Sequence, residues 1–292
     1  MKLCTFEYQG ARHAGLVLDA RVLPLSEVNA RRGTRLPEDL LAFIQAGALD
    51  ELRQSGPAEL APAALPLDQV RLRLPYPVPP KIWCIGLNYL SHAEDIQASQ
   101  PQGEPGSFMK PASCLFEPGG QIQLPPTDIS SEVDAEGELG VILGRECREV
   151  PLDQVPEVIF GYTTTLDMTA LDVLRRNPRY LTRAKSFDTF FSFGPVITTA
   201  DEVPDVLSVE VITEHNGATF SRDYVRHMAH RPYDLVAFHS RVFTWHPGDV
   251  LSTGCPKGAR IQPGDRVAAH LEGIGRLEAK VTRREAGTYI AR

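Results

Sequence analysis

The sequence predicts a β-rich α+β protein built on antiparallel or mixed sheets. From residue 121 onward, short apolar segments follow one another, and turn-forming clusters such as Pro247-Gly248-Asp249 and Pro263-Gly264-Asp265 separate them. The regular alternation of strands with long helices that a doubly wound α/β fold requires is missing. We expect strands over residues 121–124, 138–143, 158–165, 193–198, 208–214, 249–252, 266–271 and 280–282.

Residues 1–75 are predicted to form a small α+β domain that precedes the main one. Apolar stretches on both sides of Gln9-Gly10 indicate a β-hairpin, and the apolar spacing over 40–53 indicates a helix. A cluster of prolines at 75–80 then marks the boundary. We therefore expect a second, larger domain over 76–292.

A buried strand over 81–87 leads into a short helix or turn that carries His92 and Asp95. These residues are three apart and share a helix face, so they can serve as a general base and the carboxylate that orients it. The alternative is a solvated surface helix. The polar, Pro/Gly-rich stretch 97–106 is expected to be a loop that acts as a lid.

The segment VDAEGELGVILG, residues 133–144, carries two carboxylates at alternate positions. If the strand is buried, Glu136 and Glu138 leave it on one face, where like charges need a cation between them. An all-oxygen ligand set favours Mg²⁺ or Mn²⁺, and Asp167, which has apolar neighbours, is the expected third ligand. The alternative is that the two glutamates form the solvated face of an edge strand.

Two lysines are candidates for the same site. Lys185, in RAKSFDT, can place its ammonium near the carboxylates and hold a substrate oxygen; the alternative is a surface ion pair with Asp188. Lys110, in FMKPAS, is expected to face the site as well. Helices are expected after Asp167, over 169–176, and over 233–243.

Composition excludes several classes of function. With 292 residues, 42% of them hydrophobic, the chain can bury a large core. A net charge of −7 without a basic stripe argues against nucleic acid or an anionic membrane as a partner, and no apolar run suffices to span a bilayer. Five cysteines without a CxxC pair fit reduced thiols in the cytoplasm. No glycine-rich nucleotide motif is present.

Several segments together, in this order, resemble the fumarylacetoacetate hydrolase family: KIWCIGLNYLSHAED, FMKPAS, EGELGVILG, GYTTTLDMTALD, RAKSFDTF, NGATF, PGDVLSTGCPKG and GIGRL. The resemblance implies a catalytic domain of mixed, rolled sheets behind a small N-terminal domain, and a homodimer. It implies that Glu136, Glu138 and Asp167 bind Mg²⁺ or Mn²⁺ with Lys185 beside the ion. It also implies that His92 belongs to a lid dyad that activates water.

The chain departs from the family pattern around the substrate. The acid of the dyad is Asp95 where Glu is usual, and Leu171 and Leu174 replace a usual Arg and Gln. The family usually has the sequence TGTP where this chain has TGCP, so Cys255 replaces the second Thr. Tyr224-Val225-Arg226 replaces a usual Asn-Thr-Ser. The residues that we expect to bind substrate are Lys110, Arg183, Arg226, Gly254 and Cys255, with Arg175 and Arg231 as further candidates for a substrate carboxylate.

The resemblance and the residues together predict an Mg²⁺- or Mn²⁺-dependent hydrolase that cleaves a C–C bond in a small anionic 2-oxo acid, such as an acylpyruvate or fumarylpyruvate, in the breakdown of aromatic compounds. The same site also suits decarboxylation of an oxaloacetate-like acid or enol/keto isomerisation. A third alternative is a non-catalytic binding relative.

Overall fold

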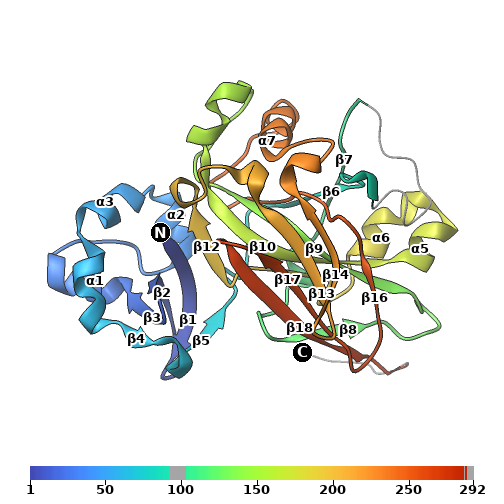
Figure 1. The fold of residues 1–292 in the computed structure, drawn as a ribbon, viewed down its shortest axis with the longest axis horizontal. Helices are drawn as coiled ribbons and strands as arrows, with labels where there is room; N and C mark the ends of the chain where they lie inside the picture. The colour runs from blue at the N-terminus through green and yellow to red at the C-terminus, as the bar shows by residue number, and fades with distance from the viewer. Residues whose placement is uncertain (92–102, 286, 288–292) are drawn as a thin grey trace.

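The computed structural model describes residues 1–91, 103–285 and 287, and arranges them as two sheets with short helices at their margins (Figure 1). The N-terminal elements are β1 (Lys2–Tyr8), β2 (Ala11–Leu18), β3 (Arg21–Pro24), α1 (Leu25–Arg32), α2 (Leu40–Gln45), α3 (Leu49–Gln54), β4 (Leu65–Pro66) and β5 (Arg71–Arg73). The predicted hairpin is confirmed, because β1 pairs with β2 through Gln9 and Gly10 at positive φ. The helix predicted over 40–53 is two helices, because Gly47, at φ 63°, follows the end of α2.

The N-terminal strands belong to the larger of the two sheets. β1 pairs antiparallel with β12 (Val196–Thr199), which pairs in turn with β10 (Ile159–Ala170). The sheet therefore continues across residue 75, and the division into domains at that residue stays a prediction.

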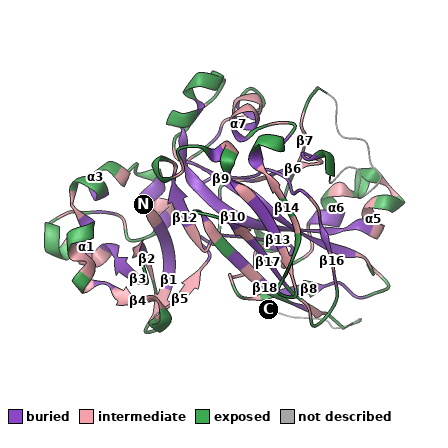
Figure 2. Cartoon of the chain, in the orientation of Figure 1, coloured by how far each residue is buried: buried purple, intermediate pink, exposed green. Residues whose placement is uncertain are grey.

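The large sheet has 13 strands. Its other members are β6 (Ile82–Gly86), β7 (Gly106–Met109), β9 (Val133–Leu143), β11 (Phe191–Phe193), β15 (Val250–Ser252) and β16 (Ala259–Ile261). The strand order is β4-β3-β2-β1-β12-β10-β9-β15-β6-β7, and β5, β11 and β16 pair with β1, β10 and β9. β9 and β10 lie in the middle, and every residue of both is buried (Figure 2).

The second sheet has five strands in the order β14-β13-β17-β18-β8. They are β8 (Gln121–Leu124), β13 (Glu210–His215), β14 (Ala218–Tyr224), β17 (Arg266–Leu271) and β18 (Gly275–Arg283). One face of β9 and β10 packs on this sheet. The residues of that shared core include Val133, Ala135, Leu166, Met168, Ala269 and Leu277. Because side chains alternate along a strand, the residues next to these on β9 and β10 face the opposite side.

Short helices complete the fold: α5 (Leu171–Arg176), α6 (Leu181–Lys185) and α7 (Pro232–Ser240). The helix predicted over 169–176 begins two residues later because β10 continues through Ala170. Turns of 3-10 helix lie at Pro57–Ala63, Leu67–Gln69, Ala112–Cys114, Leu152–Glu157, Pro178–Tyr180, Ala200–Glu202, Val206–Ser208 and Val225–His227. Within the described ranges, no helix is long and apolar enough to cross a membrane.

Candidate active site

Glu136 and Glu138 lie on the face of β9 that points away from the second sheet. Their relative exposures are 4% and 1%, and β10, β15 and β16 flank the strand, so the alternative of a solvated edge strand is wrong. Gly137 between them faces the second sheet, where a Cβ would lie 2.7 Å from Thr213 Oγ1. The Glu-Gly-Glu pattern therefore combines two acids on one face of β9 with a close contact between the two sheets on the other face.

Glu138 is held by donors from the end of β15 and from the segment that follows it. The Ser252 hydroxyl and the Gly254 N–H, at 3.0 Å, both donate to Oε2 of Glu138. Burial, together with the charges of Asp167 and Glu136, raises the pKa of Glu138 to about 8. The carboxyl is therefore short of positive charge in the metal-free protein.

Lys185 bridges the other two acids. Its Nζ lies 2.8 Å from Glu136 Oε2 and 2.9 Å from Asp167 Oδ2, and it is buried at the end of α6. The alternative surface pair with Asp188 is therefore wrong. Although burial alone would lower it, the charges of Asp167 and Glu136 hold the pKa of Lys185 well above its ordinary value. The ammonium stays charged, and Thr169 donates to the remaining Oε1 of Glu136 at 2.5 Å.

Asp167 lies directly across from Glu136 in the β9–β10 register and is fully buried. The Lys110 ammonium donates to its Oδ1 and, at 3.2 Å, to the Met168 carbonyl, while Lys185 contacts its Oδ2. Both oxygens of Asp167 thus already contact a cation. Its role as a third metal ligand stays a prediction.

One group of side chains within the described residues has the spacing of a metal site. Potential ligand atoms of Glu136, Glu138 and Cys255 all lie within 4.8 Å of one another. Carboxylate oxygens suit Mg²⁺ or Mn²⁺, and a divalent ion would supply the positive charge that Glu138 lacks. Burial, together with both glutamates, raises the pKa of the Cys255 thiol well above its ordinary value, so the thiol stays protonated and is a poor ligand. The two carboxylates are therefore the groups that fit a hard divalent ion.

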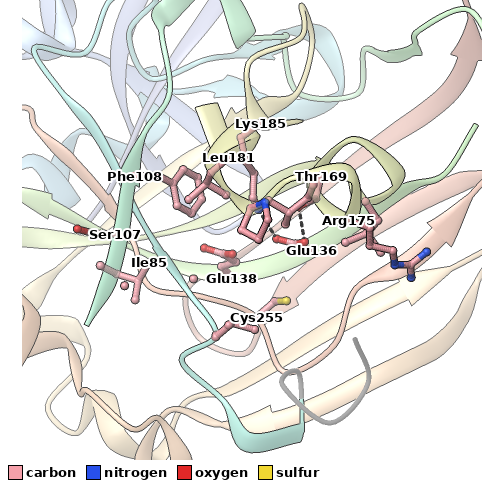
Figure 3. Close-up of a pocket in the computed structure, with 16 residues that line it drawn as sticks. Ile85, Ser107, Phe108, Glu136, Glu138, Thr169, Arg175, Leu181, Lys185 and Cys255 are labelled. Carbon is pink, nitrogen blue, oxygen red and sulfur yellow. Dashed lines mark hydrogen bonds and ion pairs between the residues drawn. The ribbon is translucent and has the colours of Figure 1, made fainter. Parts of the chain in front are cut away.

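These groups form one end of a cavity of about 410 Å³ (Figure 3). Lys185 and the glutamates meet there, and the Lys185 ammonium lies 4.8 Å from the centre of the Phe108 ring. Cys255 lies on the opposite side of the glutamates from Phe108 in this view. The cavity is large enough for a small organic acid.

The other predicted substrate residues have different positions. Gly254, at φ 91°, contributes its N–H to Glu138. Lys110 has its side chain fully buried against Asp167 and does not line the cavity. Arg183 and Arg226 are exposed, with guanidinium carbons 5.7 Å and 4.0 Å from the ring centres of Tyr180 and Tyr224, and neither lines the cavity. Their substrate contacts stay predictions.

His92 and Asp95 lie outside the described residues, so the lid dyad also stays a prediction. Sequence reasoning missed Thr169 and Ser252, which both donate to the glutamates. Thr169 follows Asp167 at the alternate position, so a strand that continues through Ala170 places both side chains on one face. Ser252 lay at the end of a predicted strand without any local signal of its partner.

A comparison with known protein families shows to which family the chain belongs. The model of the fumarylacetoacetate hydrolase C-terminal domain matches residues 81–282. The chain belongs to the fumarylacetoacetate hydrolase family. The resemblance found in the sequence motifs is therefore confirmed.

Relatives within the family carry different activities. The human mitochondrial oxaloacetate tautomerase FAHD2B is 32% identical over 84% of this chain and 80% of its own length. A Sphingobium maleylpyruvate hydrolase, solved with Mn²⁺ and pyruvate, is 29% identical with a TM-score of 0.80, covering 98% of this chain and all of that one. A Mycobacterium smegmatis 5-carboxymethyl-2-hydroxymuconate delta-isomerase is 30% identical with a TM-score of 0.76 and the same coverage. The predicted β-rich fold of this family is confirmed.

Proposed function

We propose that this protein is an Mg²⁺- or Mn²⁺-dependent hydrolase that acts on a 2-oxo acid such as an acylpyruvate. It cleaves the bond between the distal carbonyl carbon and the neighbouring CH₂. The observation that carries the proposal is the buried Lys185 ammonium, held between Glu136 and Asp167 and next to Glu138 at one end of the cavity. The relative that was solved with Mn²⁺ and pyruvate supports both the ion and the kind of acid.

Glu136 and Glu138 would hold the ion, with Asp167 as the proposed third ligand. When bound, the ion supplies a Lewis acid for the carboxylate and carbonyl oxygens of a 2-oxo acid. The hydrogen bonds from Thr169, Ser252 and the Gly254 N–H orient the two glutamates toward the cavity.

Lys185 has a role of its own. Its charge is fixed before substrate arrives, so it stabilises the negative charge that develops on the 2-oxo oxygen as the C–C bond breaks, without reorganisation. Asp167 and Lys110 hold it in place, because Lys110 takes one oxygen of Asp167 and leaves the other for Lys185.

The proposed reaction consumes one water. The water oxygen adds to the distal carbonyl carbon, the bond from that carbon to the neighbouring CH₂ breaks, and the CH₂ takes up a proton to give pyruvate and a carboxylic acid. We assign removal of the water proton to His92, oriented by Asp95, as the sequence motif predicts.

A second candidate is enol/keto tautomerisation of oxaloacetate. The similarity to the human tautomerase favours it, and it needs the same stabilised enolate without an activated water. Decarboxylation of oxaloacetate would use that enolate too.

Product analysis separates these reactions. The purified protein with Mn²⁺ is offered an acylpyruvate, fumarylpyruvate and oxaloacetate, and the products are identified by chromatography. Pyruvate plus a second carboxylic acid supports hydrolysis, whereas interconversion of oxaloacetate forms without cleavage supports the tautomerase. We expect Glu136→Gln to abolish turnover and His92→Ala to abolish hydrolysis alone. Full activity of Glu136→Gln would refute the proposed site.

A further inference from the structure

The cavity is chemically divided. Glu136, Glu138 and Lys185 form its charged end. Helix α5 and the segment that continues into α6 line the cavity on one side, and β6 and β7 line it on another. The apolar side chains that these elements contribute are Ile85, Phe108, Leu171, Leu174, Pro178 and Leu181.

Among the residues that the structure describes, this apolar wall offers no dedicated partner to a second carboxylate on the substrate. The one cation besides Lys185 among the described lining residues is Arg175, which forms a 2.5 Å ion pair with Glu132 and is half-exposed. Its guanidinium points away from Glu136 and Glu138 (Figure 3). The arginines predicted as carboxylate anchors, Arg183 and Arg226, do not line the cavity.

We propose that the cavity selects 2-oxo acids whose distal arm is an apolar chain or ring, and that it rejects those whose arm ends in a second carboxylate. This inference rests on the proposed function, because it places the 2-oxo acid group at the charged end and the arm along the apolar wall. Leu174 and its neighbours on this wall are then specificity-determining residues. An ionised carboxylate placed against such a wall would lose water without gaining a partner.

Two unreactive acids of equal length test this directly. 2-Oxooctanoate and 2-oxosuberate both have eight carbons and differ only in a terminal methyl or carboxylate, and neither has the carbonyl at C4 that cleavage requires. Isothermal titration into the Mn²⁺-loaded protein measures their affinities without turnover. We expect 2-oxooctanoate to bind at least about tenfold more tightly. Across shorter 2-oxo acids, each methylene should improve the dissociation constant about three- to fourfold.

Leu174→Arg provides the matched variant, because Leu174 lines the cavity and is only partly buried, at the edge of the core between the two sheets. We expect it to reverse the preference in favour of 2-oxosuberate, while Leu174→Met keeps the wild-type order. Leu152→Arg, on an exposed 3-10 turn away from the cavity, controls for added charge and should also keep that order.

The outcomes separate the two proposals. Equal or tighter binding of 2-oxosuberate by the wild-type protein overturns the apolar-arm inference and leaves the proposed hydrolase intact if acylpyruvates are cleaved. If neither acid binds, the apolar-arm inference is also overturned. The product analysis then decides whether the proposed hydrolase activity is refuted as well. Tighter binding of 2-oxooctanoate without cleavage of any acylpyruvate supports the inferred pocket and refutes the hydrolase.

Discussion

Lys185 donates to Glu136 across 2.8 Å at the charged end of the cavity, and both side chains are at least nine-tenths buried. Removing the cation leaves an uncompensated carboxylate in the interior. We expect Lys185→Met to lower the free energy of unfolding of the metal-free protein by about 3 kcal/mol, the range found for broken buried ion pairs. Denaturant unfolding in the presence of a chelator measures this change.

The same variant tests the catalytic role of Lys185. We expect its kcat to fall at least about a hundredfold, because the preorganised charge near the 2-oxo oxygen is lost. Lys280→Met, on the exposed side of β18, is the matched control and should change neither quantity appreciably. Unchanged stability and activity in Lys185→Met would show that the buried ion pair does not have the role assigned to it.

The affinity for metal should depend on pH through Glu138. Because its pKa is raised from 4.5 to about 8, the folded metal-free protein holds a proton there that the unfolded chain has already lost. The contribution of this group to metal-free stability therefore falls as pH rises from 4.5 to 8. A divalent ion must displace that proton, so affinity should rise by up to about tenfold per pH unit below pH 8.

Calorimetry checks this proton release. Titration of Mn²⁺ at pH 6.5 in two buffers with different ionisation enthalpies should give different apparent enthalpies, and this difference should largely disappear at pH 9. Glu138→Gln should remove most of the measurable binding. Affinity that is independent of pH, without transfer of a proton to the buffer, would contradict the raised pKa of Glu138.

Local patterns were enough to predict much of the fold. The turn clusters indicated a β-rich protein, and the alternate spacing placed Glu136 and Glu138 on one face of a strand. The burial of that strand could not be predicted, because it depends on pairing with β10 and β15, and β15 lies more than a hundred residues further along the chain. The same alternating charges also fit an edge strand that has one face in solvent.

The partners of the lysines show the same limit. Asp188 is three residues from Lys185 and was its local alternative, but the actual partners are Asp167 and Glu136, up to 49 residues away. The contact of Lys110 with Asp167 spans 57 residues. A sequence shows which residues carry charge, whereas the fold decides which opposite charges share a low-dielectric environment.

Ser252 is expected to orient Glu138 for metal binding. Its hydroxyl donates to Glu138 Oε2 and is within 2.6 Å of Thr165 Oγ1. Ser252→Ala removes one of the two donors to that oxygen. We expect its affinity for Mn²⁺ to fall about tenfold, as when other outer-shell partners of metal ligands are removed. Ser208→Ala, at an exposed position, is the control; equal affinities in both variants would mean that Ser252 does not position the ligand.

Gly137 lets the two sheets approach closely enough to position the acids on its two sides. An alanine Cβ would lie 2.7 Å from Thr213 Oγ1 and 2.9 Å from Ala269 Cβ, so Gly137→Ala must push β9 away from the second sheet. We expect a loss of about 1–3 kcal/mol in the free energy of unfolding, typical of overpacked cores. We also expect weaker Mn²⁺ binding, because Glu136 and Glu138 move with the strand.

Gly275→Ala is the matched control for this substitution. Gly275 also lies in a strand, β18, but its added Cβ would meet only Thr164 Oγ1 at an ordinary 3.6 Å. Thermal unfolding and Mn²⁺ titration of both variants should show a clear loss for Gly137→Ala and a small change for Gly275→Ala. If both variants lose stability equally, the loss comes from placing alanine in a strand. If Mn²⁺ affinity is also unchanged, the close approach of the sheets at Gly137 does not position the carboxylates.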